Sequence, residues 1–191
     1  MLSTAMKKNP SLDLTFARTW SAEILPQRPL ILPKRAFVYP QRAEEVERGA
    51  MEVLVRPAKG EPFLATCALG FADPAAPSGI WSCPHPDWIC AVSGGYAYMI
   101  DTIAPERFTQ VEYRPVLEVR ALRQQRLLLF AGHHSLLAWD AEGKAWQTAR
   151  LSSEGLSVTR IAADTLHGTG WDLLTDADVP FVIDLRTGER I

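Results

Sequence analysis

From residue 51 to residue 191, short apolar runs alternate with turn-forming residues. Each run is rich in Val, Ile, Leu or aromatic residues and is closed by Gly, Asp or Pro. The first run, residues 51–56, begins as apolar–polar alternation and stops at Pro57 and Gly60, which form a turn signal. Strands at such regular spacing are typical of a sandwich, a barrel or a propeller. The pattern therefore predicts an all-β fold for this part of the chain.

Three aspartates mark a repeat within this pattern. Asp101, Asp140 and Asp184 are separated by 39 and 44 residues, and each ends an apolar run and begins a tight turn. Upstream of each run lie another turn and another apolar strand. A unit of this kind with a period near 40 residues has the length of one four-stranded propeller blade. The predicted blade-like, four-stranded antiparallel units cover residues 62–114, 115–151 and 155–191.

Two of these repeats resemble the blades of WD40-type β-propellers. Residues 128–140, Leu-Leu-Phe-Ala-Gly-His-His-Ser-Leu-Leu-Ala-Trp-Asp, are similar to the second and third strands of a WD40 repeat. Asp178 lies six residues before Asp184, and the Asp-Leu-Arg-Thr-Gly sequence that follows is a common ending of such repeats. The likeness covers about residues 62–191. It implies a propeller-like fold whose loops present a surface to other proteins.

The likeness is divergent and incomplete. The family's Gly-His pair precedes the first strand of a blade, whereas Gly132 and His133 fall in a later turn. The Trp of the Trp-Asp pair is present at Trp139 but is replaced by Ile100 and Ile183 in the other repeats. Three units are also fewer than the roughly four to eight blades with which propellers close. We therefore predict a partial or divergent propeller whose open sheet edges need a cover.

Residues 1–49 differ from the rest of the chain because they are rich in proline and poorly periodic. Proline fixes φ and donates no ladder hydrogen bond, so we predict an N-terminal arm that precedes a β domain of residues 50–191. The elements expected in the arm are strands at residues 12–19 and 35–39 and a short helix from Ala43 to Arg48, closed by Gly49. Either this arm or a second copy of the chain is expected to cover the open edges.

Composition narrows the function classes. With 191 residues, 47% hydrophobic and 22% charged, the chain is ordinary for a globular protein. Its net charge of -2 gives no reason to expect nucleic acid or an anionic membrane as a partner. No apolar stretch is long enough to span a membrane, and none follows Lys7 and Lys8 as in a secretory signal. Three cysteines are a sparse and odd set, which favours reduced thiols and a cytoplasmic location.

The segment from Trp81 to Cys90 holds the most unusual side chains. A metal site formed by Cys83, His85 and Cys90 is one alternative. Zinc sites, however, pair cysteines at closer spacing, and the fourth ligand would be remote in the sequence. A disulfide between the two cysteines is a second alternative, disfavoured in a reducing compartment. The third alternative is that the Trp and Cys side chains of this segment pack as hydrophobic residues. We expect this third alternative, with no metal and no cofactor. The candidates for a binding surface are Trp81, His85, Trp88 and Tyr96.

Histidines supply the candidates for catalysis. His133 and His134 lie in a predicted turn, and His167 lies in a predicted strand with Asp172, so that a general base or a His–Asp unit is conceivable. No nucleophile elbow, dinucleotide-binding, Walker, HExxH or EF-hand pattern occurs in the chain. We therefore predict a non-enzymatic recognition module that binds a protein partner or a second copy of itself. The alternative is an enzyme or small-ligand-binding protein with a His-lined site on the β domain.

Overall fold

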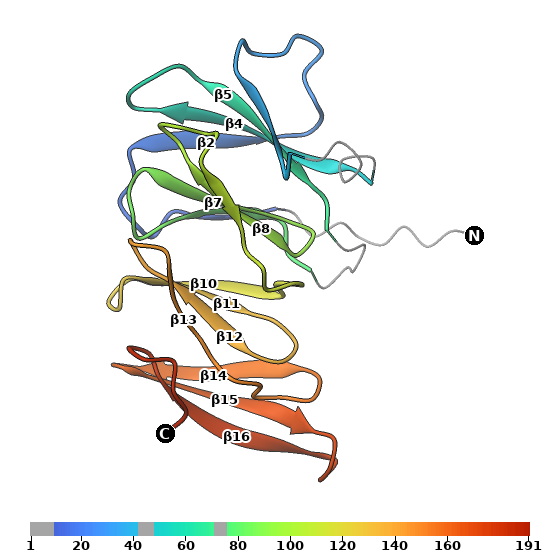
Figure 1. The fold of residues 1–191 in the computed structure, drawn as a ribbon, viewed down its shortest axis with the longest axis vertical. Coiled ribbons are helices and arrows are strands. Elements are labelled where there is room, and N and C mark those ends of the chain that lie inside the picture. The colour runs from blue at the N-terminus through green and yellow to red at the C-terminus, as the bar shows by residue number, and fades with distance from the viewer. Residues whose placement is uncertain (1–9, 42–47, 71–75) are drawn as a thin grey trace, which may run out of the picture. The chain divides into compact units, whose positions relative to one another are not determined.

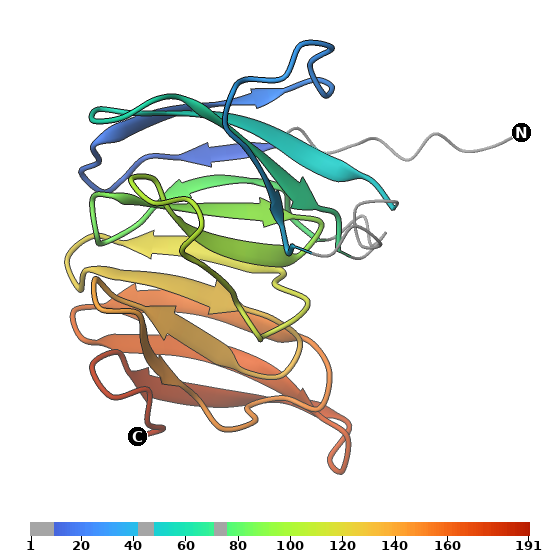
Figure 2. The same cartoon turned by 45° about the horizontal axis from the view of Figure 1, so that its top comes forward.

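The computed structural model describes residues 10–41, 48–70 and 76–191 (Figures 1 and 2). These residues form sixteen strands in four sheets, and no helix occurs among them, so the predicted all-β class is confirmed. The described part of the chain accordingly holds no apolar helix that would reach across a membrane. The chain divides into two compact units, residues 1–115 and 116–191.

The first unit contains two sheets. Its strands are β1 (Ser11–Asp13), β2 (Trp20–Leu25), β3 (Ala36–Tyr39), β4 (Ala50–Pro57), β5 (Phe63–Ala68), β6 (Gly79–Ser82), β7 (Trp88–Ser93), β8 (Tyr96–Asp101) and β9 (Phe108–Gln110). One sheet has the order β2-β4-β5-β3, and the other has the order β1-β6-β7-β8-β9. The pairs β3–β5 and β1–β6 are parallel, and the remaining pairs are antiparallel.

Alternate side chains of these two sheets share one hydrophobic core. Val53 and Phe63 from the first sheet belong to the same buried cluster as Ile80 and Tyr98 from the second. The hydroxyl of Tyr39, on the edge strand β3, donates a hydrogen bond of 2.8 Å to the carbonyl oxygen that follows β8 at Pro105. Each fully buried side chain of this size contributes about 1.5–3 kcal/mol to the free energy of unfolding. The core therefore joins segments from both ends of the unit.

The second unit contains two sheets that follow one another along the chain. Its strands are β10 (Glu118–Leu122), β11 (Leu127–Ala131), β12 (Leu136–Trp139), β13 (Lys144–Gln147), β14 (Leu156–Ala162), β15 (Thr165–Asp172) and β16 (Ala177–Asp184). The sheet orders are β10-β11-β12-β13 and β14-β15-β16, and every pair is antiparallel. Consecutive strands joined by short turns leave a local signal in the sequence, which explains why the four strands β10 to β13 could be predicted.

The core of the second unit lies between these sheets. Leu129 and Trp146 belong to the same buried cluster as Phe181 and Ile183. Gly168 on β15 lies opposite Phe181 on β16 in the same sheet, and a Cβ atom at Gly168 would lie 2.3 Å from the Phe181 ring. A side chain at this position would therefore force the ring and its neighbours apart.

The described residues form four sheets where the sequence predicts three. The unit predicted at residues 62–114 is divided, because β5 joins β2, β3 and β4, whereas β6 to β9 form a separate sheet with β1. The parallel pairing of β3 with β5 carries no local turn signal. The unit predicted at residues 115–151 contains the expected four strands, β10 to β13. The unit predicted at residues 155–191 has three strands, to which Arg190 adds an isolated bridge with Ile183.

The segment predicted as an N-terminal arm supplies strands to both sheets of the first unit. Strand β3 matches the strand expected at residues 35–39, whereas β1 ends at Asp13, whose side chain accepts the backbone N–H of Thr15 at 3.0 Å. The boundary predicted between residues 49 and 50 runs through a sheet, since β2 pairs with β4. Of the helix expected from Ala43 to Arg48, all but Arg48 lies outside the described residues, and Arg48 is in a turn.

Each aspartate of the sequence repeat closes the turn that follows its strand. One carboxylate oxygen of Asp101 accepts the backbone N–H groups two and three residues later, at 2.8 and 3.1 Å. Asp140 makes the same pair of hydrogen bonds at 2.7 and 3.0 Å, and Asp184 makes the first of them at 2.7 Å. Short polar side chains stabilise turns in this way. The repeat therefore has a structural cause in the turn at the strand end.

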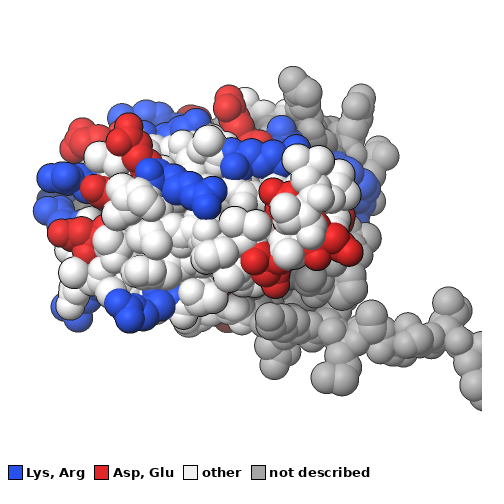
Figure 3. Space-filling model, turned by 90° about the horizontal axis from the view of Figure 1, so that it is seen from below, with Lys and Arg blue, Asp and Glu red and all other residues white. Residues whose placement is uncertain are grey.

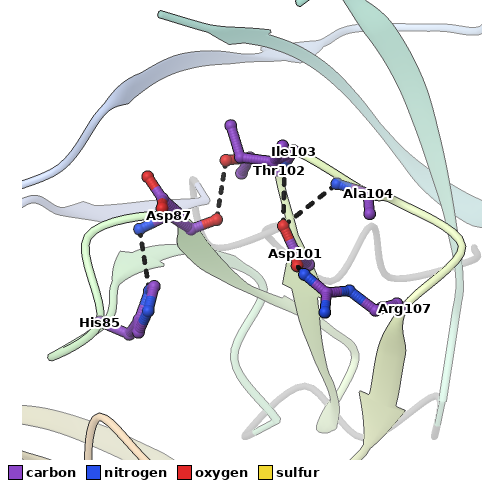
Figure 4. A network of polar contacts seen from close by, with 7 residues as sticks. All are labelled: His85, Asp87, Asp101, Thr102, Ile103, Ala104 and Arg107. Atoms are coloured by element: carbon purple, nitrogen blue, oxygen red, sulfur yellow. Dashed lines mark hydrogen bonds and ion pairs between the residues drawn. The ribbon is translucent and has the colours of Figure 1, made fainter. Parts of the chain in front are cut away.

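Asp101 is the most buried of the three, with 2% of its surface exposed. Its second carboxylate oxygen forms an ion pair with Arg107, and Figure 4 shows both contacts beside the turn. The neighbouring Thr102 donates its hydroxyl to the carbonyl oxygen of Asp87 at 2.7 Å. The Asp101 side chain thus holds both ends of the loop that leads from β8 to β9.

We predict that Asp101→Ala lowers the free energy of unfolding by about 1–3 kcal/mol, because two part-buried N–H groups lose their acceptor. Asp101→Asn keeps an acceptor oxygen and loses the ion pair with Arg107, whose side chain is 71% exposed, so its cost should be below about 1 kcal/mol. Urea unfolding followed by circular dichroism measures both. Asp178→Ala, at an exposed position, is the matched control. Equal costs for Asp101→Ala and Asp178→Ala would contradict the assignment.

Candidate functional site

The structure brings His133 and His134 together but does not extend them into a catalytic group. Both lie in the β11–β12 turn, with ring centroids 5.9 Å apart. The carbonyl oxygen of His134 accepts the N–H of Leu151 at 2.7 Å, which ties this turn to the segment before β14. The two imidazoles are therefore neighbours because they are adjacent on a turn.

His167 and Asp172 do not converge. They lie five residues apart on β15, and since side chains alternate along a strand they point to opposite faces of the sheet, with backbones roughly 16 Å apart. A ring nitrogen of His167 lies 3.3 Å from the Thr165 hydroxyl. Asp172 accepts the N–H of Leu174 at 2.7 Å and closes its own turn. No cluster of three potential metal-ligating side chains occurs among the residues that the structure describes.

The candidates for a binding surface occupy one sheet but do not form one patch. Trp81 is buried and lies opposite Cys90 in the β6–β7 ladder. Trp88 faces the same side of the sheet, whereas Tyr96 belongs to the core on the other side and lies 5.1 Å from the Arg114 guanidinium. His85 accepts a backbone N–H at 3.2 Å within the β6–β7 turn (Figure 4). These four residues therefore have different surroundings.

The cysteines are free thiols in the interior. Cys67, Cys83 and Cys90 are all buried and none is in a disulfide. Burial in apolar surroundings raises the pKa of each thiol well above its usual range. A protonated, inaccessible thiol is neither a nucleophile nor a metal ligand. Their surroundings match the expected role as small hydrophobic side chains.

A hollow of about 510 Å³ opens at one end of the second unit. The residues that line it are Gln125, Arg126, Leu127, Asp140, Ala141, Glu142, Ala145, Trp146, Asp164, Leu185 and Arg186. They come from the β10–β11, β12–β13 and β14–β15 turns, from β11 and β13, and from the segment after β16. Turns of both sheets therefore meet at this hollow, and we take it as the candidate functional site.

The floor of the hollow is apolar and rigidly held. Leu127, Trp146 and Leu185 are buried. The indole N–H of Trp146 donates a hydrogen bond of 2.8 Å to the carbonyl oxygen of Leu185, and the N–H of Leu185 donates to the carbonyl oxygen of Asp164 at 2.8 Å. Gly188 lies against the indole, since a Cβ atom there would be 2.7 Å from the ring. These contacts connect β13, the β14–β15 turn and the chain after β16.

The rim of the hollow carries charges of both signs. Glu142 and Asp164 are exposed carboxylates, and Arg126 and Arg186 are exposed guanidinium groups. Charged side chains of both signs gather along the left edge of Figure 3, on the side where these turns lie in Figure 1. The lining carries three carboxylates, those of Asp140, Glu142 and Asp164, and no hydroxyl, thiol or imidazole group. The arrangement suits binding by shape and charge.

Part of this site carries a signal in the amino-acid sequence. Asp140 and Asp184, two members of the aspartate repeat, begin the turns that contribute Glu142 and Arg186 to the rim. The aspartate repeat therefore marks the turns that form the rim, although it does not show that they form a site. That turns from two different sheets share one hollow could not be read from the spacing along the chain.

Comparison with known proteins adds little. No family model matches the chain, and no curated protein matches it. Among solved structures, the N-terminal domain of Nup159 aligns with 95% of this chain and 52% of its own length, at 16% identity and a TM-score of 0.37. The chain thus spans about half the length of that neighbour. A likeness of this size supports no conclusion about function.

We predict that Gly188→Ala costs about 1–3 kcal/mol more than Gly155→Ala in the free energy of unfolding. Both glycines have a positive φ, of 75° and 81°, so both substitutions strain the backbone to a similar degree. Only the Cβ at residue 188 meets a neighbour, the Trp146 ring. Thermal unfolding of the two variants measures the difference. Equal destabilisation by the two substitutions would contradict the prediction, because it would show that the Trp146 ring moves aside for the added Cβ atom.

We also predict that the native protein does not react with an aromatic disulfide reagent at about pH 8, because its buried thiols remain protonated. All three cysteines should react once the chain is unfolded in guanidinium chloride. Absorbance of the released thiolate gives both counts. Rapid labelling of the folded protein would refute the assignment.

Proposed function

We propose that this protein is a non-enzymatic recognition module and that the hollow of the second unit binds a segment of a polypeptide partner. The observation that carries the proposal is the meeting of turns from two sheets around an apolar floor with a rim of mixed charge. Binding residues are commonly found on loops that a rigid sheet scaffold positions.

A polypeptide fits this hollow better than a compact small molecule. The apolar floor of Leu127, Trp146 and Leu185 suits one apolar side chain of a partner. Tryptophan and arginine are the side chains enriched where protein partners bind most tightly. Carboxylates and guanidinium groups on the rim suit charged residues on either side of the inserted side chain. A peptide segment offers both features on one chain.

We extend the proposal to a divergent WD40-type module that acts in the cytoplasm. Supporting it are the antiparallel sheets of the second unit and the aspartates that close their turns. The three free, buried thiols support a reducing compartment. Self-association through the same rim is the variant of this proposal in which the partner is a second copy of the chain.

The proposal predicts that charge reversal on the rim weakens binding of peptides selected against the protein from a displayed random library. Glu142→Arg and Arg186→Glu should each raise the dissociation constant by about tenfold, because each puts a like charge against the bound peptide. Fluorescence polarisation of the labelled peptide measures the affinity.

Glu154→Arg and Arg160→Glu are matched controls, since both residues are exposed in the second unit and lie outside the hollow. They should change the affinity by less than about twofold. If the rim variants bind as the wild type does, the hollow is not the site. Loss of affinity on His133→Ala with His134→Ala would favour a His-lined site in its place.

A further inference from the structure

We infer that the loop of residues 26–35, between β2 and β3, inserts its tip into the surface of an anionic lipid bilayer. Leu30, Ile31 and Leu32 form the tip, and they are 101%, 89% and 45% exposed. The loop forms the arch of blue ribbon at the top of Figures 1 and 2. It belongs to the first unit, so the inference is independent of the hollow in the second.

The arrangement of the apolar side chains favours a fluid partner over a protein groove. The chain bends at Leu30 and Ile31, and the side chains of Leu30, Ile31 and Leu32 are all exposed. A groove on another protein takes alternate side chains of an extended peptide and leaves the others outside. The hydrocarbon boundary of a bilayer accepts apolar side chains on every side of the tip.

Prolines at both sides of the tip lower the cost of taking the backbone out of water. Pro29 and Pro33 flank Leu30 to Leu32 and carry no backbone N–H group. Every unpaired backbone N–H or C=O group adds to the cost of placing an irregular loop in hydrocarbon, and the two prolines remove two of the donors. The prolines also restrict the loop before it binds, so less conformational freedom is lost on insertion.

Basic residues lie on both sides of the tip of the loop. Arg28 precedes the tip, and Lys34 and Arg35 follow it, while no Asp or Glu occurs between residues 24 and 43. Arg28 forms an ion pair of 3.9 Å with Glu52 on β4, and Arg35 donates to the carbonyl oxygen of Glu61 at 3.4 Å. These contacts hold Arg28 and Arg35 against the sheet, and the tip between them projects. Positive charge beside an apolar tip is the pattern that anionic headgroups attract.

A second exposed apolar tip in the same chain provides a comparison. Leu173 and Leu174, in the β15–β16 turn, are 67% and 93% exposed. Their neighbours in sequence include Asp172, Asp176 and Asp178, and acidic side chains surround uncharged ones on the right of Figure 3, where this turn lies. An anionic surface repels this tip. The two tips therefore match in apolar exposure and differ in the sign of the charge beside them.

Vesicle flotation of the full chain tests the inference, with phosphatidylcholine vesicles that contain either no anionic lipid or about 30 mol% phosphatidylserine. The wild type should float with the anionic vesicles. Leu30→Ser with Ile31→Ser should lower the partition coefficient by about tenfold, and Arg28→Gln with Lys34→Gln by several-fold. Leu173→Ser with Leu174→Ser, the matched control, should change it by less than about twofold.

The depth of each tip provides a second readout. Ile31→Trp should add fluorescence that brominated phosphatidylcholine in the anionic vesicles quenches, whereas Leu174→Trp should add fluorescence that it does not quench. The inference is overturned if the wild type does not float, if it floats equally well without anionic lipid, or if the two serine pairs lose binding equally. Failure to float together with concentration-dependent self-association would assign the tip to a protein groove.

Discussion

A carboxylate at the end of a strand, accepting the N–H groups of the turn that follows, is the interaction on which much of this structure depends. Asp101, Asp140 and Asp184 each make it. A turn without such an acceptor would leave backbone donors unpaired beside a buried strand, which costs more than the hydrogen bond itself contributes. Because the acceptor is a side chain two or three residues away, the turn is specified locally.

The same turns determine where charged side chains lie close together in the second unit. Asp140 and Asp184 direct the chain so that Glu142 and Arg186 project beside one hollow, while Trp146 and Leu185 close its floor. The strands supply rigidity and the turns supply charge. A site built in this way suits recognition by shape and charge, and its lining carries three carboxylates and no hydroxyl, thiol or imidazole group. In the first unit the exposed feature is different: the loop of residues 26–35 has an apolar tip between basic residues.

Part of the fold and of the candidate site could be predicted from the sequence. The aspartate repeat identified the turns, and the strands β10 to β13 agree with the sheet expected over residues 115–151. Trp81, Cys83 and Cys90 are buried, as their expected packing requires. The histidine candidates show the limit, because His167 and Asp172 are close in sequence but lie on opposite faces of β15. Proximity along a strand does not decide proximity of side chains, since successive residues alternate between faces.

Taken alone, the sequence determined the β class, the turns and the antiparallel order of neighbouring strands in the second unit. These properties depend on contacts between residues close in the chain, through alternation and through turn-forming side chains. Only the tertiary structure decided that β5 pairs in parallel with β3 and that β1 joins β6. It also decided that turns of two sheets share a hollow and that Leu30 to Leu32 face water. Parallel pairing and the burial of a sheet face depend on segments far apart in the chain, whose meeting leaves no periodic signal in the amino-acid order.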